Sequence, residues 1–269
     1  HLPQKIMHRW RAIFIPMFLF VIAAAILLFL VRPDWLVNIR DGALSSLLFV
    51  NNWQQILAGQ SYFAQYLSPS VFTHLWYLSV YFQILLAAYL FYAFIRPRLS
   101  SRQTFWSAFI LSLLSLLLMA VLFRPGEDPS RIYYGTDTRL FAFLIGACFA
   151  YLQRTAFYEN LQKRARPWMV DAALLVLFAL AGWALLNLTD NSALTYRGGM
   201  YFFDMVIGAV LLLLTLPKSF IIKLLTFKPA VWLGKRTYGA YLWYYLVYVI
   251  FYANAQSQNF FTQSIFLQT

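Results

Sequence analysis

Charged residues are scarce in this chain, and acidic residues are the scarcest of them. Of 269 residues, 11% are charged, with 9 acidic against 21 basic side chains, whereas 62% are hydrophobic. A soluble domain carries about 25% charged and about 45–50% apolar residues. Because a water-soluble fold of this length cannot bury so much apolar surface, the composition excludes an ordinary globular enzyme and a disordered chain. It indicates several helices embedded in a bilayer.

Cysteine and histidine are almost missing, and so are the motifs of familiar soluble enzymes. The single cysteine, Cys148, lies in an apolar run, which excludes an intramolecular disulfide. The three histidines are scattered, so we expect no metal site. The sequence has no phosphate-binding P-loop, no dinucleotide-binding GxGxxG, no GxSxG of a serine hydrolase and no HExxH of a zinc protease. Any chemistry must therefore reside elsewhere.

Long apolar runs are what the sequence has instead. A transmembrane helix needs about 20 consecutive apolar residues, and continuous runs without alternation argue against strands. We predict an all-α fold, a polytopic membrane helix bundle with about seven transmembrane helices, forming a single membrane-embedded domain over residues 1–269. The predicted spans are Ala12–Val31, Leu75–Ile95, Thr104–Phe123, Thr138–Leu152, Trp168–Leu188, Met200–Leu216 and Tyr238–Ala253.

The basic residues are distributed unevenly between the loops. Fifteen of the 21 lie in segments 1–11, 96–103, 153–167 and 217–236, and six lie in the alternate segments. Because cytoplasmic loops carry the excess of lysine and arginine, we predict a cytoplasmic N-terminus and an outer position for Thr269. Topology thus accounts for the basic excess, and we expect no binding to nucleic acid.

Polar and ionisable side chains at membrane depth are costly, which makes them candidates for function. Four groups stand out: His74–Ser79 at the outer mouth of the second span, Tyr133–Arg139 before the fourth, Asp204 in the sixth, and Tyr238–Tyr245 at the start of the seventh. Structural roles compete with functional ones. Aromatic residues at span ends commonly anchor helices in the interface, and a lone interfacial histidine is commonly just hydrated.

Taken together, these segments resemble the acyltransferase 3 family of integral membrane acyltransferases. The Tyr-Tyr-Gly-Thr-Asp-Thr-Arg string is most similar to the peptidoglycan O-acetyltransferases of Gram-positive bacteria. The resemblance extends from about Lys5 to about Tyr252. It rests on motifs in the family's order and spacing: Asn52-Trp53, Tyr62-Phe63, Thr73–Val80, Tyr133–Arg139, Trp232–Tyr238 and Tyr241–Trp243.

The resemblance implies a multi-pass protein of the cell membrane that transfers an acyl group, acetyl above all, to a hydroxyl of a cell-envelope glycan such as peptidoglycan. It implies no bound cofactor. The expected partners are the lipid bilayer, a glycan acceptor and a cytoplasmic thioester donor, acetyl-CoA or another acyl-CoA. Arg9 and Arg11 resemble the family's basic motif and are expected to bind the donor's phosphates, because arginine suits phosphate geometrically. Anchoring at the membrane surface is their competing role.

The expected chemistry is acyl transfer, in which cationic or hydrogen-bonding groups stabilise an oxyanion. Polar character at membrane depth and the resemblance together select eight residues. The candidate catalytic residues are His74, Tyr134, Asp137 and Arg139, with Arg139 held by Asp137; the candidate substrate-binding residues are Arg9, Arg11, Trp76 and Ser79.

Departures from the family pattern keep other functions open. The resemblance implies ten spans, of which two precede His1 and one follows Thr269, so we expect this chain to be an incomplete domain. Tyr81 stands where the family has a carboxylate and Tyr244 where it has a histidine, and tyrosine, with an ordinary pKa near 10, is a poor base. The alternatives are a catalytically degenerate or truncated relative that binds a glycan, lipid or partner, and a transporter of acyl groups or glycans. Paired broken helices would favour the transporter, and the sequence does not show them.

Overall fold

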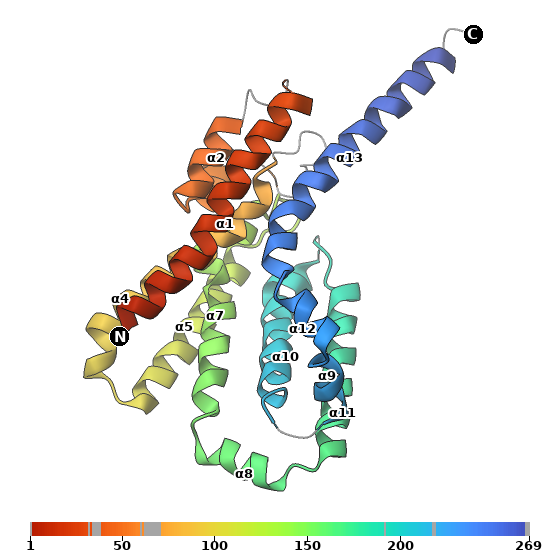
Figure 1. Cartoon of the computed structure of the whole chain (residues 1–269). Coiled ribbons are helices and arrows are strands. Elements are labelled where there is room, and N and C mark those ends of the chain that lie inside the picture. Colours follow the sequence, from red (N-terminus) through yellow and green to blue (C-terminus); the bar gives the residue numbers. More distant parts are fainter. Residues whose placement is uncertain are drawn as a thin grey trace. The chain divides into compact units, whose positions relative to one another are not determined.

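The computed structural model describes residues 2–31, 33, 39–59, 61, 71–190, 192–216 and 219–266, with side chains described between Met7 and Phe251 (Figure 1). Every regular element assigned in these residues is helical, which confirms the predicted all-α class. The chain divides into two compact units. The first comprises residues 1–60, 64–79 and 233–269, and the second comprises residues 61–63 and 80–232.

The first unit is organised around the long helix α1 (Leu2–Val31). This helix packs against α2 (Ile39–Leu47) and α13 (Thr237–Phe266), while α3 (Asn51–Leu57) packs against α2 and against the short η2 (Thr73–Leu75), which leads into α4 (Trp76–Leu90). Residues three or four apart share one face of a helix. The buried faces follow that spacing: Met17, Phe20, Ala24 and Leu28 on α1, and Leu242, Leu246 and Val249 on α13.

Four long helices form the second unit: α5 (Ser101–Leu122), α7 (Thr136–Leu152), α9 (Pro167–Asn187) and α10 (Met200–Leu213). α5 packs along α7, α7 against α10, and α10 against α9. Ser100 caps the first turn of α5 in a reciprocal capping box with Gln103. α7 and α10 approach closely at Gly208, where a Cβ would collide with the ring of Phe149. The remaining elements of this unit are residues 80–90 of α4, η3 (Phe91–Ile95), η4 (Arg96–Arg98), α6 (Ser130–Tyr134), α8 (Ala156–Arg164), η5 (Thr195–Gly199), α11 (Phe220–Leu225) and α12 (Lys228–Gly234). The last two residues of α12 belong to the first unit.

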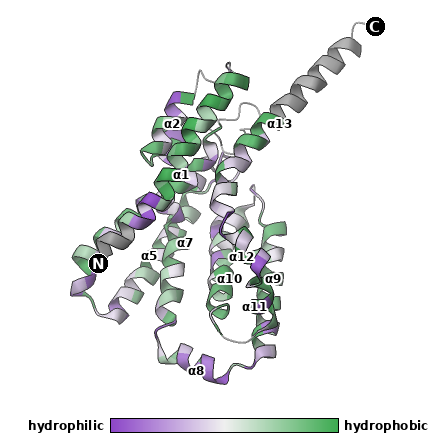
Figure 2. Cartoon of the chain, in the orientation of Figure 1, coloured by the Kyte–Doolittle hydropathy of each residue, from purple (hydrophilic) through white to green (hydrophobic). Residues whose placement is uncertain are grey.

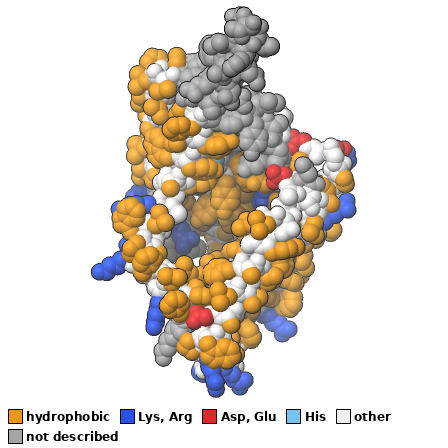
Figure 3. Space-filling view, turned by 90° about the vertical axis from the view of Figure 1, so that its right-hand side faces the viewer, with side chains coloured by type: hydrophobic (Ala, Val, Ile, Leu, Met, Phe, Trp, Pro, Cys, Tyr) orange, Lys and Arg blue, Asp and Glu red, His pale blue; other side chains and the backbone are white. Residues whose placement is uncertain are grey.

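The outer faces of the long helices are apolar. Leucine, valine and phenylalanine side chains lie exposed along α5 and α9, and Leu186 is 83% exposed. Figure 2 shows hydrophobic residues along these helices and hydrophilic ones on α8, and Figure 3 shows hydrophobic side chains over much of the visible surface. Water disfavours such a surface whereas lipid does not, so the chain is an integral membrane protein.

Five helical stretches in the described residues are long and apolar enough to cross a membrane: Met7–Val31, Thr73–Arg98, Ser101–Leu122, Pro167–Asn187 and Thr195–Leu213. A sixth arises if Thr136–Leu152 and Ala156–Arg164, which meet at a bend of 70°, form one span. These correspond to the first six predicted spans. The seventh falls in α13, and because part of it lies beyond the described side chains it stays a prediction, as do the orientation and the single-domain assignment.

Candidate active site

The turn between α6 and α7 is built around Gly135. This residue separates the two helices with φ of −62° and ψ of 129°, angles that suit any amino acid. Backbone freedom therefore does not explain the glycine. A Cβ at this position would collide with the Arg131 guanidinium, the Asp137 carboxylate and the Thr138 hydroxyl. Glycine at residue 135 therefore lets these polar side chains close over it, and any larger residue would force them to move.

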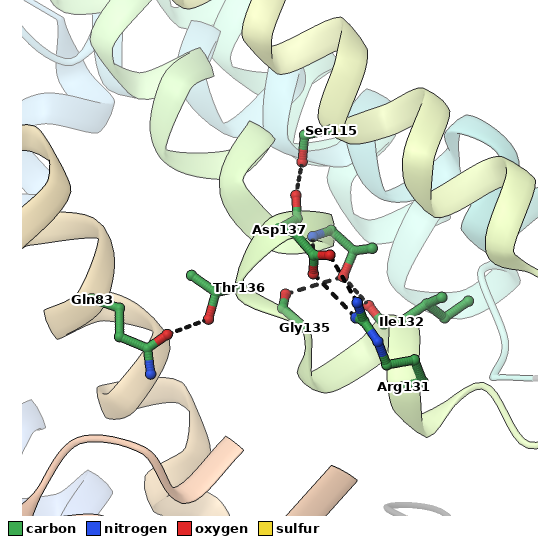
Figure 4. Close-up of polar contacts among 8 residues, drawn as sticks. Gln83, Ser115, Arg131, Ile132, Gly135, Thr136 and Asp137 are labelled. Carbon is green, nitrogen blue, oxygen red and sulfur yellow. Dashed lines mark hydrogen bonds and ion pairs between the residues drawn. The ribbon is translucent and has the colours of Figure 1, made fainter. Parts of the chain in front are cut away.

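The carboxylate of Asp137 pairs with Arg131 (Figure 4). Nη1 and Nη2 of Arg131 donate to Oδ1 and Oδ2 of Asp137 over 3.1 and 2.8 Å, and Oδ1 also accepts from the backbone N–H of Thr138 over 3.0 Å. The sequence predicted that Asp137 holds Arg139, but the structure gives this carboxylate a different partner. Residues two apart diverge by about 200° around a helix, whereas the turn at Gly135 brings Arg131 back over the start of α7.

Arg139 is held by Tyr133 and Met200. Its Nε donates to the Tyr133 carbonyl oxygen over 2.9 Å, and its Cζ lies 4.2 Å from the centre of the Tyr133 ring, a favourable cation–π distance. Its Nη1 lies 3.1 Å from Sδ of Met200, the first residue of α10. The guanidinium therefore lies between α6 and α10, where its charge also acts on Asp204.

Two motifs that are far apart in the sequence meet at the start of α7. Oγ1 of Thr136 donates to Oε1 of Gln83, on α4, over 2.6 Å (Figure 4). Tyr81, which stands where the resemblance implies a carboxylate, packs with its ring centre 5.7 Å from that of Phe143 on α7. The side chain of Tyr134 is wholly buried at the end of α6. The segment after Val80 therefore contacts α7, and does so at the first residue of that helix through Gln83.

His74 lies in the first unit, where only 4% of it is exposed. Its Nε2 is 3.1 Å from the carbonyl oxygen of Leu242. A carbonyl can only accept, so Nε2 carries a proton and the neutral imidazole presents Nδ1 as a bare lone pair. Nδ1 is buried and has no hydrogen-bond partner among the described residues. Four aromatic rings pack against the imidazole, with their centres 5.1–5.7 Å from its own: Phe20, Tyr241, Tyr244 and Tyr245.

Buried amides and hydroxyls fix the backbone on which His74 sits. Nε2 of Gln55 donates to the Thr73 carbonyl oxygen over 3.1 Å, and the Tyr241 hydroxyl donates to the His74 carbonyl oxygen. Ser79, predicted to bind substrate, is fully buried; its Oγ accepts from the Asn51 backbone N–H over 3.1 Å at the start of α3. Trp76 is buried on the first turn of α4. Ser79 is therefore already engaged in positioning α3 and α4.

Arg9 and Arg11 lie near the start of α1, and both are exposed. Two residues apart on a helix, their side chains diverge by about 200°. They belong to the first unit together with His74, Trp76 and Ser79, whereas Tyr134, Asp137 and Arg139 belong to the second. The predicted site residues thus form two groups.

Unsatisfied buried polar atoms mark both groups. In the part of the chain that the structure describes, three buried side-chain atoms lack a hydrogen-bond partner: Thr73 Oγ1, His74 Nδ1 and Tyr196 OH. Such atoms are rare in native proteins, and each one calls for an explanation such as a ligand or a water. The sequence pattern did not select Thr73, Arg131 or Tyr196. Thr73 adjoins the candidate residue His74, and Arg131 lies close to the Tyr133–Arg139 segment. Tyr196 has no candidate residue beside it in the sequence.

Comparison with known proteins agrees with these motifs. The acyltransferase 3 family, described as an acyltransferase domain, matches residues 1–268. The chain belongs to the acyltransferase 3 family. This confirms the resemblance drawn from the sequence. No solved structure matches the chain significantly.

Several acyltransferase 3 relatives match most of the chain. It is 32% identical over 235 residues to YrhL of Bacillus subtilis, provisionally named a peptidoglycan O-acetyltransferase, with 87% of this chain and 37% of YrhL covered. It is 29% identical over 246 residues to the peptidoglycan O-acetyltransferase OatA of Listeria monocytogenes (91% and 39%). It is 30% identical over 242 residues to the O-acetyltransferase OatA of Staphylococcus aureus (87% and 39%). The chain therefore spans under two fifths of these relatives.

Proposed function

We propose that this chain is the membrane part of an O-acyltransferase that moves an acetyl group to a hydroxyl of a cell-envelope glycan, peptidoglycan in the first instance. The observation that carries the proposal is membership of the acyltransferase 3 family over residues 1–268. The name of the Listeria relative supports peptidoglycan as the acceptor. We place the protein in the cell membrane, with acetyl-CoA or another acyl-CoA as the cytoplasmic thioester donor.

We assign His74 the role of proton acceptor in this proposal. Its Nε2–H is used by the Leu242 carbonyl, so the base is Nδ1, which is buried and has no partner among the described residues. A hydroxyl presented to Nδ1 donates its proton there in this proposal. The Leu242 carbonyl fixes both the tautomer and the orientation of the imidazole, and general-base catalysis by a histidine requires both.

Arg139 is the group best suited to stabilise negative charge. Tyr133 and Met200 hold its guanidinium in place, so little rearrangement is needed when an oxyanion forms. Asp137 and Tyr134 contribute indirectly in this proposal. The ion pair of Asp137 with Arg131 fixes the turn at Gly135, and the buried Tyr134 ends the helix on which Tyr133 lies. Both therefore position the backbone that holds Arg139.

The proposed reaction needs two reactants, the acceptor hydroxyl and the acyl thioester, and no other. The acceptor hydroxyl oxygen forms a bond to the acyl carbon and loses its proton to a base, while the carbon–sulfur bond of the thioester breaks and the thiol leaves with a proton. Arg9 and Arg11 are the proposed ligands of the donor's phosphates. Because they point to different sides of α1, we expect each to contribute separately rather than as one clamp. Trp76 and Ser79 act by fixing the first turn of α4.

Labelled acetyl transfer by the full-length protein in reconstituted vesicles tests the proposal. With labelled acetyl-CoA and a muropeptide acceptor, we expect ester-linked label on the glycan. Arg139→Ala should lower kcat by about 10²–10³-fold, as removal of an oxyanion donor does. Arg124→Ala is the matched control, because Arg124 is exposed and its ion pair among the described residues is a local one, with Glu127 over 3.5 Å. Equal activity of the two variants removes Arg139 from the site; no transfer by the wild type supports a non-catalytic relative.

A further inference from the structure

Tyr196 occupies the kinked segment that precedes α10. Within η5 the backbone leaves helical geometry at Arg197 and at Gly198, whose φ is 137°. The Tyr196 side chain is completely buried. Its ring stacks on Phe123 at a centroid distance of 4.8 Å and joins the cluster of Met119, Ile132, Phe141 and Ile145. The ring is thus held by apolar packing alone, which fixes where its hydroxyl points.

The Tyr196 hydroxyl has no hydrogen-bond partner among the described residues. Other buried or part-buried hydroxyls of the same unit do have partners. The hydroxyl of Tyr158 lies 2.6 Å from Oγ1 of Thr215, that of Tyr201 lies 3.1 Å from Oγ of Ser112, and Thr195, the neighbour of Tyr196, donates to the Thr189 carbonyl over 2.7 Å. A phenyl ring would fill the same apolar space without the cost of desolvating a hydroxyl. Packing therefore does not explain the oxygen.

Three charged side chains act on this hydroxyl electrostatically. Asp190, Arg139 and Asp128 act on it through their charges, and the phenol of Tyr133 acts on it as well. Arg139 is the guanidinium to which we assign oxyanion stabilisation, and it lies over the ring of Tyr133. A ligand atom shared by a phenol O–H and a guanidinium must accept hydrogen bonds and must tolerate or carry negative charge. An oxygen meets both conditions, whereas an ammonium or amide N–H does not.

We propose that the Tyr196 hydroxyl donates a hydrogen bond to the carbonyl oxygen of the acyl group during transfer, beside Arg139. This rests on the proposed acyltransferase function and adds a second group to its charge stabilisation. As the tetrahedral intermediate forms, negative charge develops on that oxygen, so a fixed donor and a fixed cation both bind it more strongly than they bind the ground state. The competing occupant is a buried water, which accepts the same hydrogen bond but contributes nothing to the reaction.

Deleting the Tyr196 hydroxyl in the full-length protein distinguishes the acyl carbonyl oxygen from a buried water as the acceptor of its hydrogen bond. Tyr196→Phe should fold as stably as the wild type, because no protein hydrogen bond is lost, yet its kcat for acetyl transfer should fall by about 10²-fold or more. The KM for the acyl-CoA should change by less than about threefold, since the contact strengthens only in the transition state. The matched control is Tyr158→Phe, which deletes a buried hydroxyl that has a protein partner. It should lower thermal stability and leave kcat within about threefold of the wild type.

A second variant guards against misfolding. Incorporation of 3-fluorotyrosine at position 196 keeps a hydroxyl donor, so it should retain a substantial part of the activity that Tyr196→Phe loses. If Tyr196→Phe keeps kcat within about threefold of an active wild type, the water occupies the site and the inference is overturned while the proposed function stands. If the fluorinated protein is as inactive as Tyr196→Phe, the hydroxyl is likewise not the source of the effect. If the wild type itself transfers no acetyl, the proposed function fails and the inference fails with it.

Discussion

Replacing Gly135 by alanine gives a prediction whose sign follows directly from the structure. The added methyl group would meet the Arg131 guanidinium, the Asp137 carboxylate and the Thr138 hydroxyl at distances that require them to move. Because φ at residue 135 is −62°, alanine adds no backbone strain. It also raises the free energy of unfolding by about 0.4–1 kcal/mol, since it lowers the conformational entropy of the unfolded chain. Overpacking costs about 1–3 kcal/mol, and displacing a hydrogen-bonded charge costs about 1.5–3 kcal/mol more. We expect a net loss of about 1.5–5.5 kcal/mol.

Gly146→Ala is the internal control, because the same substitution eleven residues further along, inside α7, should have the opposite effect. Gly146 lies inside α7, and a Cβ there meets no atom within 4 Å. Alanine in a helix interior is favoured over glycine by about 0.5–1 kcal/mol, so this variant should be slightly more stable than the wild type.

Thermal unfolding in detergent, followed with a thiol-reactive dye, measures both variants. The single cysteine of the chain, Cys148, is buried and becomes reactive on unfolding. Each kcal/mol shifts the midpoint by about 2–4 °C in chains of this size. Gly135→Ala should therefore melt several degrees below the wild type and Gly146→Ala slightly above it. A Gly135→Ala protein that melts with or above Gly146→Ala refutes the idea that polar side chains close over Gly135.

Two further predictions concern Asp128 and His74. Burial raises the pKa of Asp128, but hydrogen bonds from Ser130 and Ser61 outweigh it and hold the folded pKa below its ordinary value. The stabilisation of α6 by Asp128 is thus complete above pH about 4 and is lost as the pH falls through the folded pKa. Hydrogen exchange at residues 130–134 should become faster over that pH range. In Asp128→Ala these residues should lack the protection at every pH. His74→Gln keeps a donor for Leu242 but no base, so kcat should fall by about 10²–10⁴-fold with the fold intact; a variant that keeps full activity excludes Nδ1 as the base.

The long helices could be predicted from the sequence because their signal is strong and local. A run of about 20 apolar residues has few alternatives to a membrane-embedded helix, and the first six predicted spans correspond to helices of the structure. Their ends are less certain from sequence. The fourth predicted span, Thr138–Leu152, corresponds to a helix that starts at Thr136 and is separated from α6 by one extended glycine.

Side-chain partners were harder to predict, because they depend on turns that composition does not reveal. The sequence suggests that Asp137 and Arg139 pair, yet the turn at Gly135 brings Asp137 into an ion pair with Arg131. Asn51 and Gln55, which flank Trp53, are likewise buried and bond to Ser45 and to the backbone of η2, which composition does not reveal. Tyr196 could not be selected at all, since one tyrosine among 18 stands out only once its hydroxyl is seen to lack a partner.

The fate of a labelled acetyl group tests the central claim most directly. The full-length protein in vesicles, supplied with labelled acetyl-CoA on the lysine- and arginine-rich side and muropeptide on the other, should place label on the glycan as an ester that mild alkali releases as acetate. The Arg139→Ala protein in parallel vesicles should label the glycan about 10²–10³-fold more slowly. Label that crosses the membrane unattached indicates a transporter, and label that stays on the donor indicates a binding protein; either result contradicts the account.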